Sequence, residues 1–200
     1  MLRRFQAAML LATLAGVLGL SASRAWAQTV ERMEIGAEYT FVNSNAPPGD
    51  CGCFTLSGAN GWFAYNFTHH WAAVGEVGGG YASKIDGTAS DLTFSTFLGG
   101  VRYSRQLMDR LAPFGQFLIG AAHADGALTP DLAGMPAGAN AFAMAAGGGM
   151  DLEGSRYWKL RLIELDYLLA RFDNGVNHHQ NNARVSIGAA FRFGGGTPRR

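Results

Sequence analysis

The chain has 200 residues, enough for one domain and a targeting segment. Its 16 basic and 15 acidic residues are nearly balanced, which argues against a nucleic-acid-binding protein, a class marked by clustered positive charge. Charged residues make up only 16% of the chain, against a usual ~25%, and glycine, with 28 residues, is about twice as frequent as usual.

The first 27 residues have the pattern of a secretory signal peptide. Two arginines precede an apolar run of 16 residues, and Ala25-Trp26-Ala27 fits the A-x-A cleavage pattern. The run is shorter than the ~20 residues of a membrane-spanning helix, so an anchor is the weaker alternative. We predict that residues 1–27 are removed on export, which leaves 13 basic and 15 acidic residues in the mature chain.

Eight stretches of the mature chain alternate apolar and polar residues with a period of two. This period predicts β-strands, because successive side chains of a strand point to opposite faces. The stretches are 33–41, 57–67, 71–81, 92–103, 113–123, 141–152, 157–172 and 183–193.

Two of these stretches depart from strict alternation. Leu118 shares the face of Gln116 in 113–123, and Arg161 falls among the apolar residues of 157–172. The arginine either extends its side chain to a membrane interface or marks a β-bulge, where an extra residue shifts the alternation.

The connections between the predicted strands alternate in length. Those after the second, fourth and sixth strands are short, whereas the others are mostly longer and rich in Gly, Pro, Asn and Asp. An even number of strands with short turns at one end and long loops at the other is typical of outer-membrane barrels. We therefore predict an all-β fold: an eight-stranded antiparallel up-and-down transmembrane β-barrel over residues 28–193, with aromatic residues near both rims.

A soluble periplasmic barrel would show the same alternation with its apolar face turned inward. The stretch 183–193 favours the membrane, because Arg184 and Arg192 lie opposite a row of purely apolar residues. The low total charge also suits an exterior that contacts lipid. A lipocalin-like ligand-binding barrel is the soluble alternative.

In a membrane barrel, the polar face of each strand lines the lumen. The charged residues on that face are Glu34, Glu38, Glu76, Arg102, Asp151, Glu164, Asp166, Arg184 and Arg192. Because side chains just fill the interior of an eight-stranded barrel, we expect these groups to form structural ion pairs, with a narrow, gated conductance as the alternative. Closure of the barrel predicts that Arg192 lies level with Glu34, and that Arg184 approaches the acidic residues of 157–172.

Several segments resemble the bacterial outer-membrane β-barrel domain family, which includes small eight-stranded, outer-membrane protein A-like "porin family" proteins. They are GGVRYS at 99–104, PFGQFLIGA at 113–121, GGGMDL at 147–152 and LRLIELDYLLARF at 160–172. The resemblance implies an integral protein of the bacterial outer membrane, embedded in lipid. It also implies a structural, adhesive or surface-interaction role and at most narrow passive permeability. We expect a monomer, and the resemblance identifies no surface ligand.

The last predicted strand carries a further part of this resemblance. Its residues Ser186, Gly188, Phe191 and Phe193 match the polar-x-Gly-x-x-aromatic-x-aromatic signal by which the barrel assembly machinery recognises such proteins. Family members commonly end on the aromatic residue. Here residues 194–200 follow it, and we expect them to form a flexible periplasmic tail.

The predicted outer loops contain cysteine and histidine. Cys51 and Cys53 are separated by one residue in an exported chain, which favours a local disulfide, with free thiols or metal binding as alternatives. Two sulfurs do not complete a zinc site, and His178 and His179 are more typical of solvated loop residues. We expect no metal and no cofactor.

The chain carries no hydrolase motif and no nucleotide-binding loop. No G-x-S-x-G occurs, and the glycine runs 78–80 and 147–149 match neither phosphate-binding fingerprint. Glycine inside these strands more simply relieves crowding. We expect no catalytic residues and no enzymatic activity; an outer-membrane enzyme that modifies lipid A is the alternative.

Overall fold

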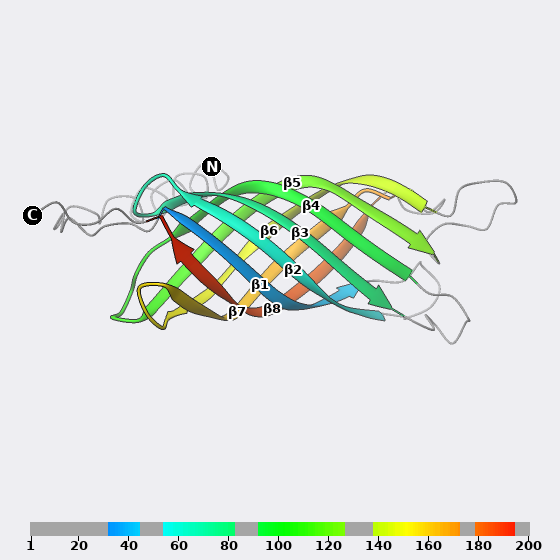
Figure 1. The fold of residues 1–200 in the computed structure, drawn as a ribbon. Helices are drawn as coiled ribbons and strands as arrows, with labels where there is room; N and C mark the ends of the chain where they lie inside the picture. The colour runs from blue at the N-terminus through cyan, green and yellow to red at the C-terminus, as the bar shows by residue number, and fades with distance from the viewer. Residues whose placement is uncertain (1–31, 45–53, 83–91, 127–137, 173–178, 195–200) are drawn as a thin grey trace, which may run out of the picture.

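The protein forms a closed barrel of eight antiparallel strands in consecutive order (Figure 1). The structure is a computed structural model that describes residues 32–44, 54–82, 92–126, 138–172 and 179–194. The strands are β1 (Met33–Ser44), β2 (Phe54–Asn66), β3 (Trp71–Ala82), β4 (Leu92–Ser104), β5 (Leu111–Gly126), β6 (Gly138–Glu153), β7 (Trp158–Ala170) and β8 (Gln180–Phe193). The predicted up-and-down barrel is confirmed. No helix within the described ranges is both long and apolar enough to span a membrane.

The two ends of the barrel differ in how the strands are connected. Short turns over residues 67–70, 105–110 and 154–157 lie at the end where β1 begins and β8 finishes, which we call the turn end. The opposite end, where β1, β3, β5 and β7 finish, is the loop end (Figure 1). At the turn end the closing register pairs Glu34 of β1 with Arg192 of β8, as predicted.

The outer face of the barrel is apolar. Large hydrophobic side chains such as Val77, Leu165 and Ile187 are about half exposed, although they lie in the middle of their strands. Aromatic residues gather near both rims, among them Tyr65, Trp71, Tyr103, Trp158 and Phe191 at the turn end and Tyr39, Phe41, Tyr81 and Phe142 at the loop end. This is the opposite of a soluble barrel, which buries its apolar face, so the lipocalin-like alternative is not supported.

A β-bulge in β7 explains the irregular alternation around Arg161. The pairing of β7 with β8 shifts between Arg161 and Glu164, and Leu162 and Ile163 between them both face outward. The bulge therefore turns Arg161 inward together with Glu164, and its side chain is only 2% exposed. Of the two interpretations of this arginine, the bulge is right and the extension to a membrane interface is wrong.

One glycine makes room for a large side chain inside the barrel. Gly36 pairs with Trp62 across β1 and β2, and a Cβ atom at Gly36 would overlap the indole ring. Trp62 is buried and points into the lumen. Glycine inside this strand thus relieves crowding, as the sequence suggested.

Candidate functional site

The lumen consists of two regions stacked along the barrel axis. The charged layer comprises Glu34, Glu38, Glu76, Arg102, Asp151, Lys159, Arg161, Glu164, Asp166, Arg184 and Arg192, and extends from the turn end to the middle of the strands. The apolar mouth comprises Val42, Leu56, Leu92, Phe94, Leu168, Ala170 and Phe172, and lies at the loop end.

All nine charged residues expected in the lumen belong to the charged layer. Eight of them are buried, and Arg192 is partly buried, with 17% of its side chain exposed at the turn end. The sequence reasoning did not place two buried cations, Lys159 and Arg161, in the lumen. Both are odd-numbered residues before the bulge, and after the bulge the odd-numbered residues face outward, so simple alternation assigns these two cations to the outer face. The adjacent apolar residues Leu162 and Ile163 were the available signal, since they separate two alternating runs of opposite parity.

Arg161 connects three strands at the centre of the charged layer. Its Nη1 lies 2.6 Å from Glu38 Oε1 of β1 and 2.5 Å from Glu164 Oε2 of β7. Its Nε donates to Asp151 Oδ1 of β6 at 2.9 Å. A guanidinium group can satisfy several carboxylates at once because its five N–H donors point in fixed, diverging directions.

Arg184 forms a second centre nearer the loop end. Its Nη2 lies 2.6 Å from Asp166 Oδ2 on β7, as predicted for this arginine, and 3.6 Å from Glu164 Oε1. Its Nη1 donates to Glu76 of β3, on a strand that is not a neighbour of β8. This pair therefore crosses the lumen.

At the turn end, Glu34 is the shared partner of two cations. Lys159 Nζ lies 2.8 Å from Glu34 Oε2 and 2.8 Å from Asp151 Oδ2. Arg192 Nε lies 3.3 Å from Glu34 Oε1, and Arg192 also pairs with Glu153. The predicted proximity of Arg192 to Glu34 is confirmed.

Arg102 is held by an amide and by aromatic rings. Its Nε and Nη2 donate to Gln116 Oε1 at 3.1 and 2.8 Å, and Gln116 Nε2 donates in turn to Glu164 Oε1 at 2.9 Å. Its guanidinium carbon lies 4.3 Å from the ring centroid of Trp62 and 4.9 Å from that of Phe114. Cation–π contacts of this kind stabilise a buried cation beyond its hydrogen bonds.

The charged layer has the properties of a closed structural network. Each of its six carboxylates pairs with a basic side chain, and the pairs Lys159–Glu34, Arg161–Glu38 and Arg184–Glu76 join strands that are not neighbours in the barrel. Buried charges are tolerated only when paired, and breaking one such pair is costly. Among the described residues, no group of three or more His, Cys, Asp or Glu side chains is arranged to hold a metal ion.

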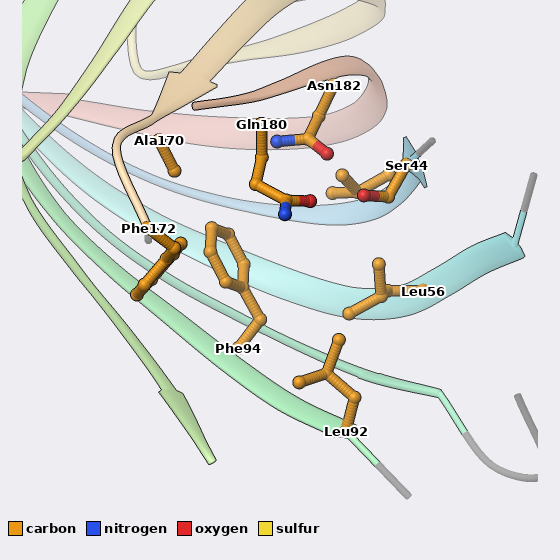
Figure 2. A pocket seen from close by; sticks show the side chains of 9 residues that line it. Ser44, Leu56, Leu92, Phe94, Ala170, Phe172, Gln180 and Asn182 are labelled. Carbon is orange, nitrogen blue, oxygen red and sulfur yellow. The ribbon is translucent and has the colours of Figure 1, made fainter. Parts of the chain in front are cut away.

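The apolar mouth contains a hollow lined by residues of β1, β2, β4, β7 and β8 and by Phe172 (Figure 2). Its empty volume, including the part open to solvent, is about 280 Å³. Phe94 and Phe172 form an edge-on aromatic pair in its wall, with ring centroids 6.2 Å apart.

The residues of the assembly signal are divided between the two faces of β8. Ser186 is buried, and its Oγ lies 2.6 Å from Thr40 Oγ1. A Cβ atom at Gly188 would contact the Glu38 side chain at 2.6 Å, so this position also faces the lumen. Phe191 is exposed and stacks between Tyr157 and Phe193, with ring centroids 6.4 and 6.3 Å away.

Four predicted features lie outside the described residues. These are the signal peptide over residues 1–27, the Cys51 and Cys53 pair, His178, and the tail from residue 195 onward. His179 is exposed and lies immediately before β8. The disulfide, like recognition of the assembly signal, stays a prediction.

Comparison with known proteins gives one family and a set of related folds. The family model of the outer membrane protein beta-barrel domain matches residues 12–197. The crystal structure of neisserial surface protein A aligns with a TM-score of 0.61 and 10% identity, over 80% of this chain and 97% of that one. Ail, the attachment invasion locus protein of Yersinia pestis, aligns with a TM-score of 0.50 and 15% identity, over 81% and 97% of the two chains. No curated protein sequence matches the chain.

Proposed function

The chain belongs to the outer membrane protein β-barrel domain family, and from that premise we propose that it is a closed, non-catalytic scaffold whose loops act at the bacterial surface. The role is structural, adhesive or surface-interacting. Loops on a rigid scaffold are where binding residues commonly collect, which supports a role for the loop end.

The observation that carries this proposal is the set of ion pairs that cross the lumen. Arg161 joins β7 to β1 and β6, and Arg184 joins β8 to β3 and β7. A solute passing through would have to separate buried pairs, each strongly held in a region of low dielectric. This arrangement favours a filled support over an open pore, and it supports at most narrow permeability.

The proposal includes an orientation and a route. Residues 1–27 direct export and are removed, residues 28–193 form the barrel, and residues 194–200 extend into the periplasm. The turn end faces the periplasm and the loop end faces the exterior, as is general for bacterial outer-membrane barrels. Ser186, Gly188, Phe191 and Phe193 direct recognition by the barrel assembly machinery, and the folded monomer then contacts lipid.

The first experiment tests the membrane barrel itself. The mature chain is folded in detergent and run on a gel with and without boiling, and the unboiled form is expected to migrate faster. Recovery of the mature protein as a soluble monomer without detergent would overturn the proposal.

The second experiment tests closure of the lumen. The folded protein is placed in planar bilayers, where we expect no large, regular conductance steps. Sustained open-channel steps would instead assign the protein a pore function. The double variant Glu76→Ala/Arg184→Ala, which removes a cross-lumen pair, is the matched comparison and should conduct more than the native protein.

The third experiment addresses catalysis. Lipid A from cells with and without the protein is compared by mass spectrometry, and the acyl chains are expected to be the same. Loss or gain of an acyl chain only in cells that contain the protein would replace the scaffold proposal with an enzymatic one.

A further inference from the structure

We propose that the turn between β4 and β5, residues 105–110, binds anionic phospholipid headgroups in the periplasmic leaflet of the membrane. The turn lies at the turn end of the barrel (Figure 1). The proposal names a lipid class for the proposed function. It rests on that function for two points, that the barrel spans the membrane and that the turn end faces the periplasm.

The tip of this turn is apolar and held in place by hydrogen bonds. Leu107 and Met108 are 65% and 63% exposed, more than any other large hydrophobic side chain among the described residues. The Leu107 N–H donates to the Leu111 carbonyl oxygen at 2.9 Å. Gln106 Nε2 donates to the Asp109 carbonyl oxygen, also at 2.9 Å. Two adjacent apolar side chains held in this way would gain free energy by leaving water.

Leu107 lies on the side of the hairpin that faces lipid. The pairing of β4 with β5 continues beyond the end of β4, because the Arg105 N–H donates to the Pro113 carbonyl oxygen at 3.1 Å. The bond from Leu107 to Leu111 keeps the same register. Since side chains alternate along paired strands, Arg105 and Leu107 face outward, as Tyr103 does.

The apolar face of β4 gives the depth of the turn. At the loop end this face begins at Phe97, because the next outward residue, Ser95, is polar and pairs with His123. From Phe97 to Leu107 the chain advances ten residues, and ten residues at ~3.3 Å each, tilted about 40°, rise about 25 Å. This rise equals the height of the apolar band of an outer-membrane barrel. Leu107 therefore lies at the periplasmic boundary of the band.

The turn end carries an excess of positive charge. Among the described residues there, four arginines are exposed and Asp109 is the one exposed carboxylate. The described part of the loop end has one exposed charge of each sign, Arg171 and Asp125. Basic side chains near a membrane surface attract anionic headgroups, and an arginine can donate two hydrogen bonds to one phosphate. The four arginines are Arg32, Arg105, Arg110 and Arg156.

The apolar tip and the arginines together favour a lipid surface over a soluble polyanion. A polyanion such as an acidic glycan would pair with the arginines and leave Leu107 and Met108 in water. A phospholipid offers phosphate oxygens to the arginines and acyl chains to the tip. Arginine suits this boundary because its apolar stem can lie along the acyl chains while its charged group reaches the phosphates.

The first test measures lipid selectivity of the full mature chain in phosphatidylcholine vesicles. Electron spin resonance compares how strongly the protein retains spin-labelled phosphatidylglycerol and spin-labelled phosphatidylcholine. We expect about a twofold preference for the anionic lipid, and a fall toward equal retention in Arg105→Gln/Arg110→Gln. Arg171→Gln, which removes an exposed arginine of the loop end, is the control and should keep the preference.

Two results would overturn the charged contact. One is a native protein that retains both lipids equally, and the other is a preference that survives unchanged in Arg105→Gln/Arg110→Gln. Unfolding in vesicles of phosphatidylcholine alone, whose surface has no net charge, should be similar in the native protein and the variants. That result would show that the loss of preference does not come from a damaged fold.

The second test places the tip with an added tryptophan. The difference in fluorescence between Leu107→Trp and the native protein isolates the added ring. We expect phospholipids brominated near the headgroup to quench it, and aqueous acrylamide to quench it little. His69→Trp, at the exposed polar tip of the turn between β2 and β3, is the control and should be open to acrylamide. A ring at position 107 as open to acrylamide as the ring at 69 would overturn the lipid anchor, and would point to a partner in the periplasm instead.

The heat-dependent gel shift of each sample separates this proposal from the membrane barrel. A protein that shows the shift but has no preference for anionic lipid contradicts only the anchor. A protein without the shift contradicts the proposed function first.

Discussion

Along the inward face of β1, Glu34 and Glu38 belong to the charged layer, whereas Val42, four residues further, belongs to the apolar mouth. The same change occurs along β7, from Asp166 to Leu168. The charged layer is held by directional pairs that depend on one another, and the apolar mouth by contacts that are not directional. Single changes should therefore cost more in the charged layer, where each leaves an unpaired buried charge, than beside a hollow that can adjust.

The largest effect is expected when the central cation of the charged layer is removed. Arg161→Ala leaves Glu38, Asp151 and Glu164 without this partner, and the free energy of unfolding should fall by about 3–5 kcal/mol. Urea unfolding in lipid vesicles would measure it. Arg105→Ala, in an exposed turn, is the control and should change stability by less than about 0.5 kcal/mol. Similar losses in the two variants would mean that the pairs contribute little.

A truncation in the apolar mouth should cost less. Leu168 is buried, and Leu168→Ala is expected to lower the free energy of unfolding by about 2 kcal/mol, the lower end for buried leucines, since the site can relax toward the hollow. The same unfolding experiment applies. Leu165→Ala, a lipid-facing neighbour, should cost less than Leu168→Ala. A loss above that of Arg161→Ala would reverse the proposed order of the two regions.

Substituting one glycine in each region by alanine tests how tightly the two regions are packed. Gly36→Ala should destabilise the barrel by about 1–2 kcal/mol, because the new Cβ overlaps the Trp62 ring beside the charged layer. Gly80→Ala should cost less than Gly36→Ala, since its Cβ would meet no atom closer than Leu56 Cβ, at 3.3 Å, with Leu56 Cδ2 and the Ser57 carbonyl oxygen at 3.8 Å. The double variant Gly36→Ala/Trp62→Leu should recover part of the loss in unfolding free energy. Without such recovery, the cost does not come from this contact.

A smaller effect than that of Arg161→Ala or Leu168→Ala is expected at the uncharged hydrogen bond between β1 and β8. Ser186→Ala removes the nearer partner of Thr40 Oγ1, which then keeps only the Val185 carbonyl oxygen at 3.4 Å, and should cost about 1 kcal/mol in unfolding experiments. The variant Thr40→Val/Ser186→Ala, which keeps the shape of residue 40, should be no less stable than Ser186→Ala alone, because neither hydroxyl of the pair then remains. A loss as large as that of Arg161→Ala would contradict the view that charge, and not burial alone, makes the charged layer sensitive.

Sequence reasoning identified the lumen charges where alternation was regular. Glu34, Glu38, Glu76 and Arg184 lie on the polar faces of strands with a strict period of two, and all four are buried. Arg161 was ambiguous, because an arginine among apolar residues fits either an interface or a bulge. The backbone of β7 decides between them. Because Leu162 and Ile163 face outward one after the other, the residues before them alternate in the opposite sense to the residues after them, and Arg161 points into the lumen.

The contacts of Trp62 were beyond sequence reasoning. Its Nε1 donates to Glu38 Oε1 at 2.5 Å, and its ring lies against the guanidinium groups of Arg102 and Arg161. These residues come from β1, β4 and β7, so their proximity depends on how the barrel closes. No spacing within the chain encodes that distance.

By itself, the sequence determined the eight strands, their antiparallel order and the face to which most side chains point. It could do so because strand alternation and turn length are local properties of the chain. Only the tertiary structure decided that Arg184 pairs with Glu76 across the lumen, that Arg161 joins three strands, and that a hollow with an unpaired Gln180 oxygen lies at the loop end. Each of these depends on strand register and on one bulge, and a shift of a single residue in either would turn the side chains to the other face.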